Sequence, residues 1–129
     1  MNILCDTNAV TGLRLGNPIV LGALEHAETV FLSVIVLGEL LYGYQNGRKR
    51  DENMRFLDAF TSKSRVEVLG VGHETASVYA ELRTELKRAG RPIPTNDLWI
   101  AAQSIENGAA LISNDAHFEH LIGLRRISF

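Results

Sequence analysis

The chain has 129 residues, of which 46% are hydrophobic and 22% are charged, a composition typical of a folded domain rather than a disordered segment. Its single cysteine, Cys5, excludes a scaffold held by internal disulfides, and its net charge of −2 excludes a general binder of polyanions. No apolar run approaches the roughly 18–20 residues of a membrane-spanning helix. We therefore expect one domain over residues 1–129 of a soluble, cytoplasmic protein.

Short apolar runs alternate with longer helical patterns along the chain, which predicts an α/β fold with a mostly parallel sheet. Strands are expected at residues 3–5, 30–32, 66–69, 110–112 and within 124–128. Helices are expected over residues 18–26, 34–44, 50–62, 74–89 and from about 97 to 107. Asn17, Ser33 and Asn96 are the predicted N-caps, and Gly90 is a predicted helix stop.

Glu39 is the only charged residue between Glu28 and Arg48, in the middle of an apolar helical pattern. The row expected to face the core is Val34, Leu37, Leu41 and Tyr44. A neighbouring row, related by the three-and-four spacing of a helix, is Ile35, Gly38, Glu39 and Tyr42. Glu39 therefore either faces water or lies beside a group that approaches the helix closely at Gly38.

Three further acids fall at positions where functional side chains are common. Asp6 directly follows the first strand and Asp115 follows the fourth, where functional groups of parallel sheets gather. Asp97 lies in the first turn of a helix, where the helix dipole alone would also favour an acid. If these acids and Glu39 converge, their mutual repulsion would be relieved by a bound Mg²⁺ or Mn²⁺. Two such ions can activate water and stabilise the leaving oxygen in phosphodiester cleavage.

Other reaction classes have weaker support in the sequence. No phosphate-binding glycine motif or nucleophile elbow is present, and one cysteine makes a structural zinc site a poor expectation. A receiver-type phosphoacceptor domain would need an acid pair after the first strand and a lysine after a late strand. No acid pair follows the first strand here, and the last lysine of the chain is Lys87.

Four segments in chain order carry a family resemblance: LCDTN at residues 4–8, SVIVLGELLYG at 33–43, NDLWIAA at 96–102 and SNDAHF at 113–118. The family-like tail follows at residues 121–124. With these segments the chain resembles the PIN-domain ribonucleases, and within them the VapC-type toxins of bacterial and archaeal toxin–antitoxin pairs. The resemblance spans nearly the whole chain, in the order of the family.

The resemblance implies a PIN-like three-layer α/β/α sandwich with a central, mostly parallel sheet. The four acidic positions of the family, which would be catalytic and would hold Mg²⁺ or Mn²⁺, fall on Asp6, Glu39, Asp97 and Asp115. Thr7 stands where relatives carry a hydroxyl that supports the first acid or its water. His117 stands where many relatives carry another aspartate, so the metal position beside Asp115 departs from the family pattern.

The activity implied is that of a metal-dependent endoribonuclease, which hydrolyses RNA phosphodiester bonds as the toxin of a toxin–antitoxin system. The resemblance also implies a homodimer and a small antitoxin whose extended carboxyl-terminal segment crosses the toxin. Because arginine pairs with carboxylates through two parallel hydrogen bonds, we expect the antitoxin to insert a basic side chain into the acidic site. The flanking apolar residues that could support docking are Leu37, Leu40, Leu41 and Tyr44. The expected RNA-facing cations are Arg48, Lys49 and Arg50.

A catalytically silent PIN-like module that binds protein or RNA is the alternative. The intact set of four acids argues against this alternative, and an assay of RNA cleavage with a series of metals separates the two.

Overall fold

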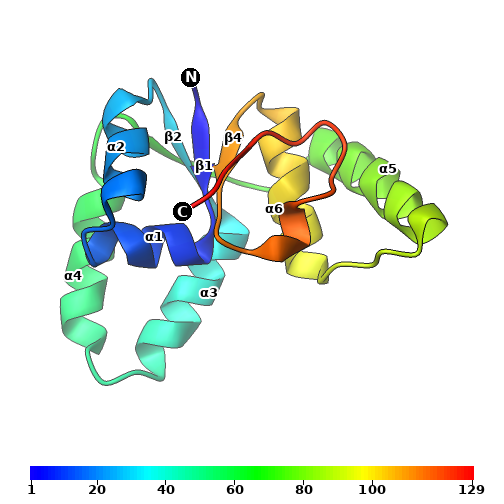
Figure 1. Ribbon diagram of the computed structural model, residues 1–129. Coiled ribbons are helices and arrows are strands. Elements are labelled where there is room, and N and C mark those ends of the chain that lie inside the picture. Colours follow the sequence, from blue (N-terminus) through cyan, green and yellow to red (C-terminus); the bar gives the residue numbers. More distant parts are fainter.

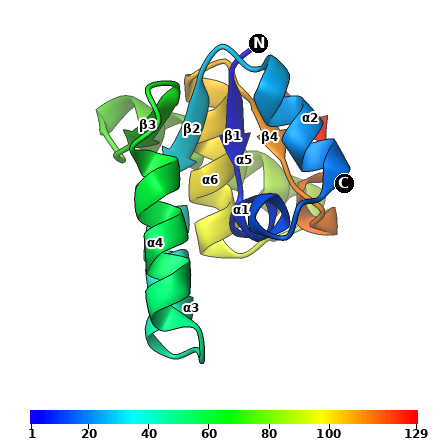
Figure 2. The same cartoon turned by 90° about the vertical axis from the view of Figure 1, so that its left-hand side faces the viewer.

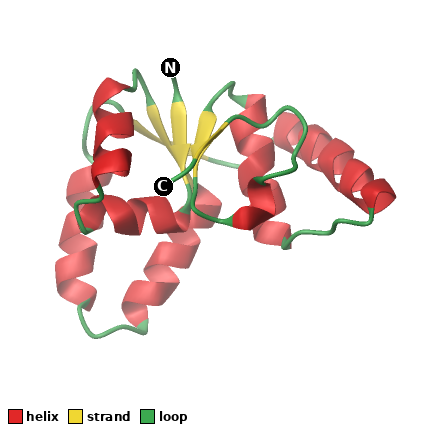
Figure 3. Cartoon of the chain, viewed as in Figure 1, coloured by secondary structure: helices red, strands yellow, loops and turns green.

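Five parallel strands form one sheet in the computed structural model, which describes residues 1–129 (Figure 3). In chain order the strands are β1 (Ile3–Cys5), β2 (Val30–Ser33), β3 (Val66–Leu69), β4 (Ala110–Ile112) and β5 (Arg126–Ile127). Their order across the sheet is β3-β2-β1-β4-β5, and every neighbouring pair is parallel. The predicted α/β fold with a parallel sheet is confirmed.

Six α-helices and one short 3₁₀ helix surround the sheet. The helices are α1 (Thr7–Arg14), α2 (Pro18–His26), α3 (Val34–Gln45), α4 (Arg50–Thr61), α5 (His73–Ala89), α6 (Thr95–Glu106) and η1 (Ala116–Phe118). Figure 1 places α1, α2 and α4 on one side of the sheet and α5 and α6 on the other, so the sheet is the middle layer. None of these helices combines the length and apolar character needed to cross a membrane.

Burial across the sheet explains the sequences of its strands. β1, β2 and β4 are buried along their whole length, as expected for central parallel strands that are covered on both faces. The edge strand β3 is only half-buried and carries the exposed Glu67. A core of 28 buried apolar residues joins the sheet to the helices, and each large aliphatic side chain in it contributes roughly 1.5–3 kcal/mol.

Helices α3 and α4 form a hairpin that extends beyond the carboxyl ends of the strands (Figure 2). The row of α3 that was predicted to face the core is displaced: only Tyr44 of it is buried, Leu37 and Leu41 are half-buried, and Val34 is 39% exposed. The buried row is Val36, Leu40 and Tyr44. These residues are spaced by four, so they lie one above another on the side that packs against the rest of the protein.

The helix ends test the predicted caps. The side chains of Asn17 and Ser33 accept backbone N–H hydrogen bonds from α2 and α3, as predicted. Gly90 ends α5 with a φ of 67°, a left-handed conformation that favours glycine. The predicted cap at Asn96 is wrong, because Pro94 occupies the N-cap position and α6 begins directly after it.

The first helix, α1, has no counterpart in the sequence prediction. Asp6 caps it, since its Oδ1 accepts the backbone N–H of Ala9 at 2.7 Å. Thr11 and Gly12 are weak helix formers and obscure the helical pattern. The acid identified for its position after the first strand therefore also begins a helix.

Candidate metal centre

Parallel pairing brings the ends of β1 and β4 together. Cys5 of β1 lies opposite Ile112 of β4, and the next N–H along, that of Asp6, donates to the Ile112 carbonyl at 3.2 Å. The first turn of α1 and the loop after β4 are joined by a hydrogen bond from Asn8 Nδ2 to Asn114 Oδ1 at 3.0 Å. The pairing of β1 with β4 therefore places Asp6 and the segment leading to Asp115 side by side, as predicted from their positions after strands.

Asp6 is the most buried acid of this region, with 5% of its surface exposed. Burial is the main cause that raises its pKa, because the charged form loses water, and the charges of Asp115 and Asp97 raise it further. Hydrogen bonds from Ser113 and from the Ala9 N–H act in the opposite direction. Asp6 therefore lies close enough to Asp97 and Asp115 to interact with their charges.

Asp97, Asp115 and His117 form the tightest cluster of ionisable groups at this edge of the sheet. His117 Nδ1 lies 2.9 Å from Asp97 Oδ2 and 3.1 Å from Asp115 Oδ1. One ligand atom from each of the three residues lies within 4.8 Å of the others. Burial raises the pKa of Asp97, the hydrogen bond with His117 lowers it, and the charge of Asp115 raises it.

Several backbone and side-chain contacts fix Asp115 in place. Its N–H donates to Ser113 Oγ at 3.0 Å, and its Oδ1 accepts the N–H of His117 at 2.9 Å. Arg126 of β5 donates to the Asp115 carbonyl at 2.7 Å. The loop after β4 is therefore held on both sides, and the carboxylate of Asp115 is oriented before any ligand binds.

Glu39 lies on the α3 side of the site, outside this cluster. Its Oε1 accepts the hydroxyl hydrogen bond of Thr7 at 2.8 Å, which ties α3 to the start of α1. An open hollow of about 730 Å³ lies beside it and is lined by Thr7, Val34, Ile35, Gly38, Glu39, Tyr42 and Asn96. The neighbouring row predicted on α3 therefore does line one surface, and a Cβ at Gly38 would meet nothing within 4 Å.

Arg48 and Lys49 lie in the exposed turn between α3 and α4, at the tip of the hairpin, and the exposed Arg50 is the first residue of α4. At about 1.5 Å of rise per residue, this turn begins roughly 10–15 Å along α3 from Glu39. The structure brings them together with none of the four acids. Their contact with RNA stays a prediction.

His117 is the member of the cluster that sequence reasoning did not select. The sequence showed it only as a departure from an expected aspartate, and its two-residue spacing from Asp115 was the available signal. The structure places its imidazole between Asp97 and Asp115, so it supplies a donor where a third carboxylate was expected.

The donor set suits a divalent cation. Carboxylate oxygens are typical ligands of Mg²⁺ and Mn²⁺, whereas an imidazole nitrogen is more typical of transition-metal sites. Two carboxylates with one imidazole, beside the buried Asp6, therefore fit Mn²⁺ at least as well as Mg²⁺.

Comparisons with known proteins identify relatives over most of the chain. A family model described as the PIN domain matches residues 3–124. Ribonuclease VapC2 of Rickettsia felis is 40% identical over 87 residues, which cover 67% of this chain and 63% of that protein. The tRNA(fMet)-specific endonuclease VapC of Shigella flexneri is 32% identical over 95 residues, which cover 73% of this chain and 70% of that protein.

Solved structures extend the likeness to the full length. VapBC2 from Rickettsia felis, bound to a DNA fragment from its promoter, superposes with a TM-score of 0.87 and 32% identity. The DNA-bound VapBC from Salmonella typhimurium superposes with a TM-score of 0.86 and 25% identity. Each match covers 99% of this chain and 98% of the other. The five-stranded sheet and its flanking helices are therefore an arrangement found in these proteins.

Proposed function

Since this chain belongs to the VapC ribonucleases of the PIN-domain family, we propose that it is a metal-dependent endoribonuclease that acts as the toxin of a toxin–antitoxin pair. The observation that supports the metal dependence most is the cluster of Asp97, Asp115 and His117 beside the buried Asp6. Acidic groups held this close repel one another unless a cation or proton neutralises them.

The residues of the site have separate roles in this proposal. Asp6, Asp97 and Asp115 would hold the ion with their carboxylates, and His117 would add a nitrogen donor. Glu39 would orient the ion from the α3 side, because Thr7 fixes one of its carboxylate oxygens and leaves the other free. When bound, Mg²⁺ or Mn²⁺ supplies positive charge at the phosphate and lowers the pKa of water.

The reaction is hydrolysis of an RNA phosphodiester. A water oxygen forms a bond to phosphorus, the bond to the leaving ribose oxygen breaks, and the proton lost by water balances the proton gained by the leaving group. The open hollow gives a bulky polymer access to Glu39, which a closed pocket would not.

An RNA cleavage assay tests this function. The purified chain should cut single-stranded RNA with Mn²⁺ or Mg²⁺, and EDTA should stop the reaction. Asp6→Asn should lose cleavage although Asn can still cap α1, so the variant should fold. Cleavage in EDTA, or by Asp6→Asn at the wild-type rate, would overturn the metal mechanism. A folded wild type that cuts no RNA with any metal would favour the silent module.

We propose further that a small antitoxin occupies the acidic site with a basic side chain and that the chain forms a homodimer in the cytoplasm. The solved relatives named above are VapBC proteins, which supports a partner of this kind. Of the apolar residues expected to flank the site, Leu40 and Tyr44 are buried and offer no docking surface, which corrects the sequence prediction, and Leu37 and Leu41 are half-buried. The exposed apolar side chains in the hollow beside Glu39 are Val34 and Tyr42, which were not among those expected.

Co-expression with the adjacent small reading frame tests the partner. The purified complex should not cut RNA, and replacing the basic residues near the partner's carboxyl terminus with alanine should restore cleavage. Full inhibition by the alanine-substituted partner would show that inhibition works elsewhere than in the acidic site.

A further inference from the structure

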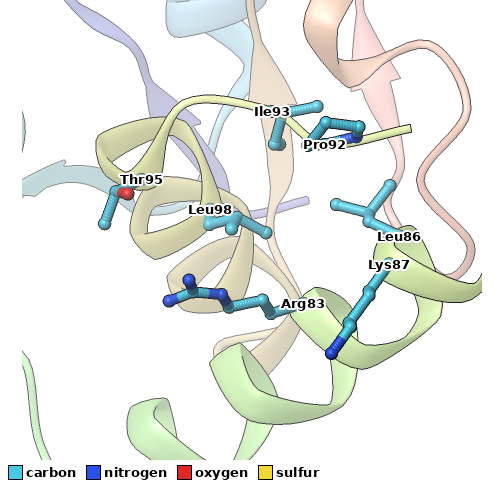
Figure 4. Close-up of a pocket in the computed structure, with 7 residues that line it drawn as sticks. All are labelled: Arg83, Leu86, Lys87, Pro92, Ile93, Thr95 and Leu98. Atoms are coloured by element: carbon cyan, nitrogen blue, oxygen red, sulfur yellow. The ribbon is translucent and has the colours of Figure 1, made fainter. Parts of the chain in front are cut away.

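A groove between α5 and α6 is not used by the metal centre. Its volume is about 480 Å³, and its apolar floor is formed by Leu86, Ile93 and Leu98. Arg83 and Lys87 stand one turn apart on α5 at its rim (Figure 4). An apolar floor with two cations at one edge suits a ligand that is flat and apolar at one end and anionic at the other.

The first turn of α6 connects this groove to the acids. Thr95 lines the groove, Asn96 lines the hollow beside Glu39, and Asp97 belongs to the metal-ligand cluster. Consecutive helical residues point in different directions while rising only about 1.5 Å each. The groove and the acidic site therefore lie around the same first turn of α6.

The two cations of the groove are not neutralised by acids of the chain. No carboxylate lies within 4.0 Å of the charged nitrogens of Arg83 or Lys87. All the ion pairs of the structure involve other residues. Arg83 donates to the hydroxyl of Tyr79 at 2.9 Å, and Tyr79 stacks on Trp99 of α6 at 3.9 Å. This contact orients the guanidinium while leaving its charge uncompensated.

Some arginines of the chain are committed to the fold. Arg65 donates to the carbonyls of Leu24 and Ala27, and Arg126 donates to the carbonyl of Asp115. Arg83 has no such backbone acceptor. Its guanidinium is held by Tyr79 alone, so its charge stays available to an anionic ligand at the edge of the apolar floor.

We infer that this groove holds the RNA next to the cleavage point, with a backbone phosphate on Arg83 and Lys87 and an unstacked base on the apolar floor. The inference rests on the proposed ribonuclease function. Single-stranded RNA fits because it pairs a negative charge with an apolar base face at every nucleotide, and positive grooves that follow its backbone are common. The cations also offset the repulsion between RNA phosphates and the four acids.

Binding of a labelled RNA tests the inference without cleavage. The probe is a 5′-fluorescein single-stranded oligonucleotide, and the protein is full-length Asp6→Asn, followed by fluorescence anisotropy in Mg²⁺. Adding R83A and K87A should weaken binding at least about tenfold at low salt. It should also make the slope of log K against log[salt] shallower by about 0.7, the contribution of the one single-stranded phosphate that the two cations share.

Arg88→Ala is the matched control. Arg88 lies on the same helix but lines a different surface, with Ala80, Glu81, Thr84 and Glu85. It should leave the affinity and the salt slope near those of the parent. In the active chain, R83A and K87A together should raise KM and leave kcat unchanged, because the groove holds substrate away from the reacting bond. Melting curves establish that all variants fold.

Two outcomes would overturn the proposed RNA subsite: a double variant that binds RNA like its parent, or an Arg88→Ala variant that loses as much affinity as the double variant. A double variant that binds RNA like its parent but no longer binds the antitoxin would show that the groove is a protein-docking surface. These outcomes leave the proposed function standing if the wild type still cuts RNA.

Discussion

The two sides of the acidic site differ in how far they are assembled. On the side of β4 and α6, His117 lies within hydrogen-bonding distance of both Asp97 and Asp115, and Arg126 and Ser113 hold the loop that carries Asp115. On the side of α3, a single carboxylate, that of Glu39, is held by the hydroxyl of Thr7 beside an open hollow.

This difference separates two tasks that a metal-dependent nuclease must perform. A rigid cluster with few degrees of freedom retains an ion, because little ordering remains to be done when the ion binds. An open side with one oriented acid leaves room for a substrate. We therefore expect substitutions on the β4–α6 side to act on metal affinity, and substitutions on the α3 side to act mainly on turnover.

Asp97→Asn should have the largest effect of the substitutions in this comparison. Removing one charged ligand should lower cleavage at saturating RNA by at least about a hundredfold, together with a loss of metal affinity. The fold should survive, since the acid contributes at most about 1 kcal/mol through the dipole of α6. Single-turnover cleavage and a metal titration measure both effects. A variant with normal metal affinity would contradict the assigned division of tasks.

Glu39→Gln should come next, with cleavage reduced roughly tenfold to a hundredfold and metal affinity changed much less. Glutamine keeps the shape and an oxygen for the Thr7 hydroxyl but loses the charge. The matched variant Thr7→Val keeps the Glu39 charge and removes the hydrogen bond of 2.8 Å, so its effect should be smaller. Wild-type turnover by Glu39→Gln would assign Glu39 to the solvent-facing surface instead.

His117→Ala should weaken Mn²⁺ binding about tenfold, the usual effect of losing one supporting donor. Mg²⁺ binding should fall less, because an imidazole nitrogen suits a transition metal better. His120→Ala is the control. The ion pair of its ring is with Glu119, at 4.0 Å, and not with an acid of the site. Calorimetric titration with each metal gives the comparison, and equal losses for both metals would remove the selectivity assigned to the nitrogen.

The stability of the metal-free chain should fall as pH rises. The pKa values of Asp6 and Asp97 are raised in the folded chain, so the folded state binds more protons than the unfolded state between the ordinary and the raised values. The stabilisation is complete below the ordinary value and is lost as pH rises through the folded value. Melting curves in EDTA at several pH values should therefore show a smaller dependence for Asp6→Asn than for the wild type. Excess metal should raise the wild-type melting temperature at neutral pH.

The smallest expected effect is on stability, from substitutions of Asp6 as the N-cap of α1. Asp6→Asn should melt at or above the metal-free wild type, because it removes a buried charge and can keep the hydrogen bond to Ala9. Asp6→Ala should lie about 1 kcal/mol below Asp6→Asn in unfolding free energy. Equal stabilities for the two variants would show that the hydrogen bond to Ala9 contributes nothing.

Sequence patterns predicted the parts of this protein that depend on local order. The five strands, and Asp6 and Asp115 after two of them, followed from short apolar runs and from the rule that side chains gather at strand ends. The helix α1 was missed because Thr11 and Gly12 weaken its signal. The buried row of α3 was misplaced because its helical pattern is apolar on more than one side.

The parts that could not be predicted depend on contacts between distant segments. The ring of His117 meets Asp97 from 20 residues away, and the hydroxyl of Thr7 meets Glu39 from 32 residues away. The groove beside the site requires α5 to pack along α6, which brings Arg83 to the same rim as the start of α6. No spacing within one helix or strand contains this information.

The most direct test of the central claim is a Mn²⁺ titration followed by electron paramagnetic resonance, in which the signal of free Mn²⁺ falls as the ion binds. The wild-type chain should bind Mn²⁺ at least about tenfold more tightly than Asp97→Asn, and Glu39→Gln should lie closer to the wild type. The bound ion should also show coupling to a nitrogen nucleus, and this coupling should disappear in His117→Ala. Equal Mn²⁺ binding by the wild type and Asp97→Asn would contradict the claim that the β4–α6 side of the site holds the metal.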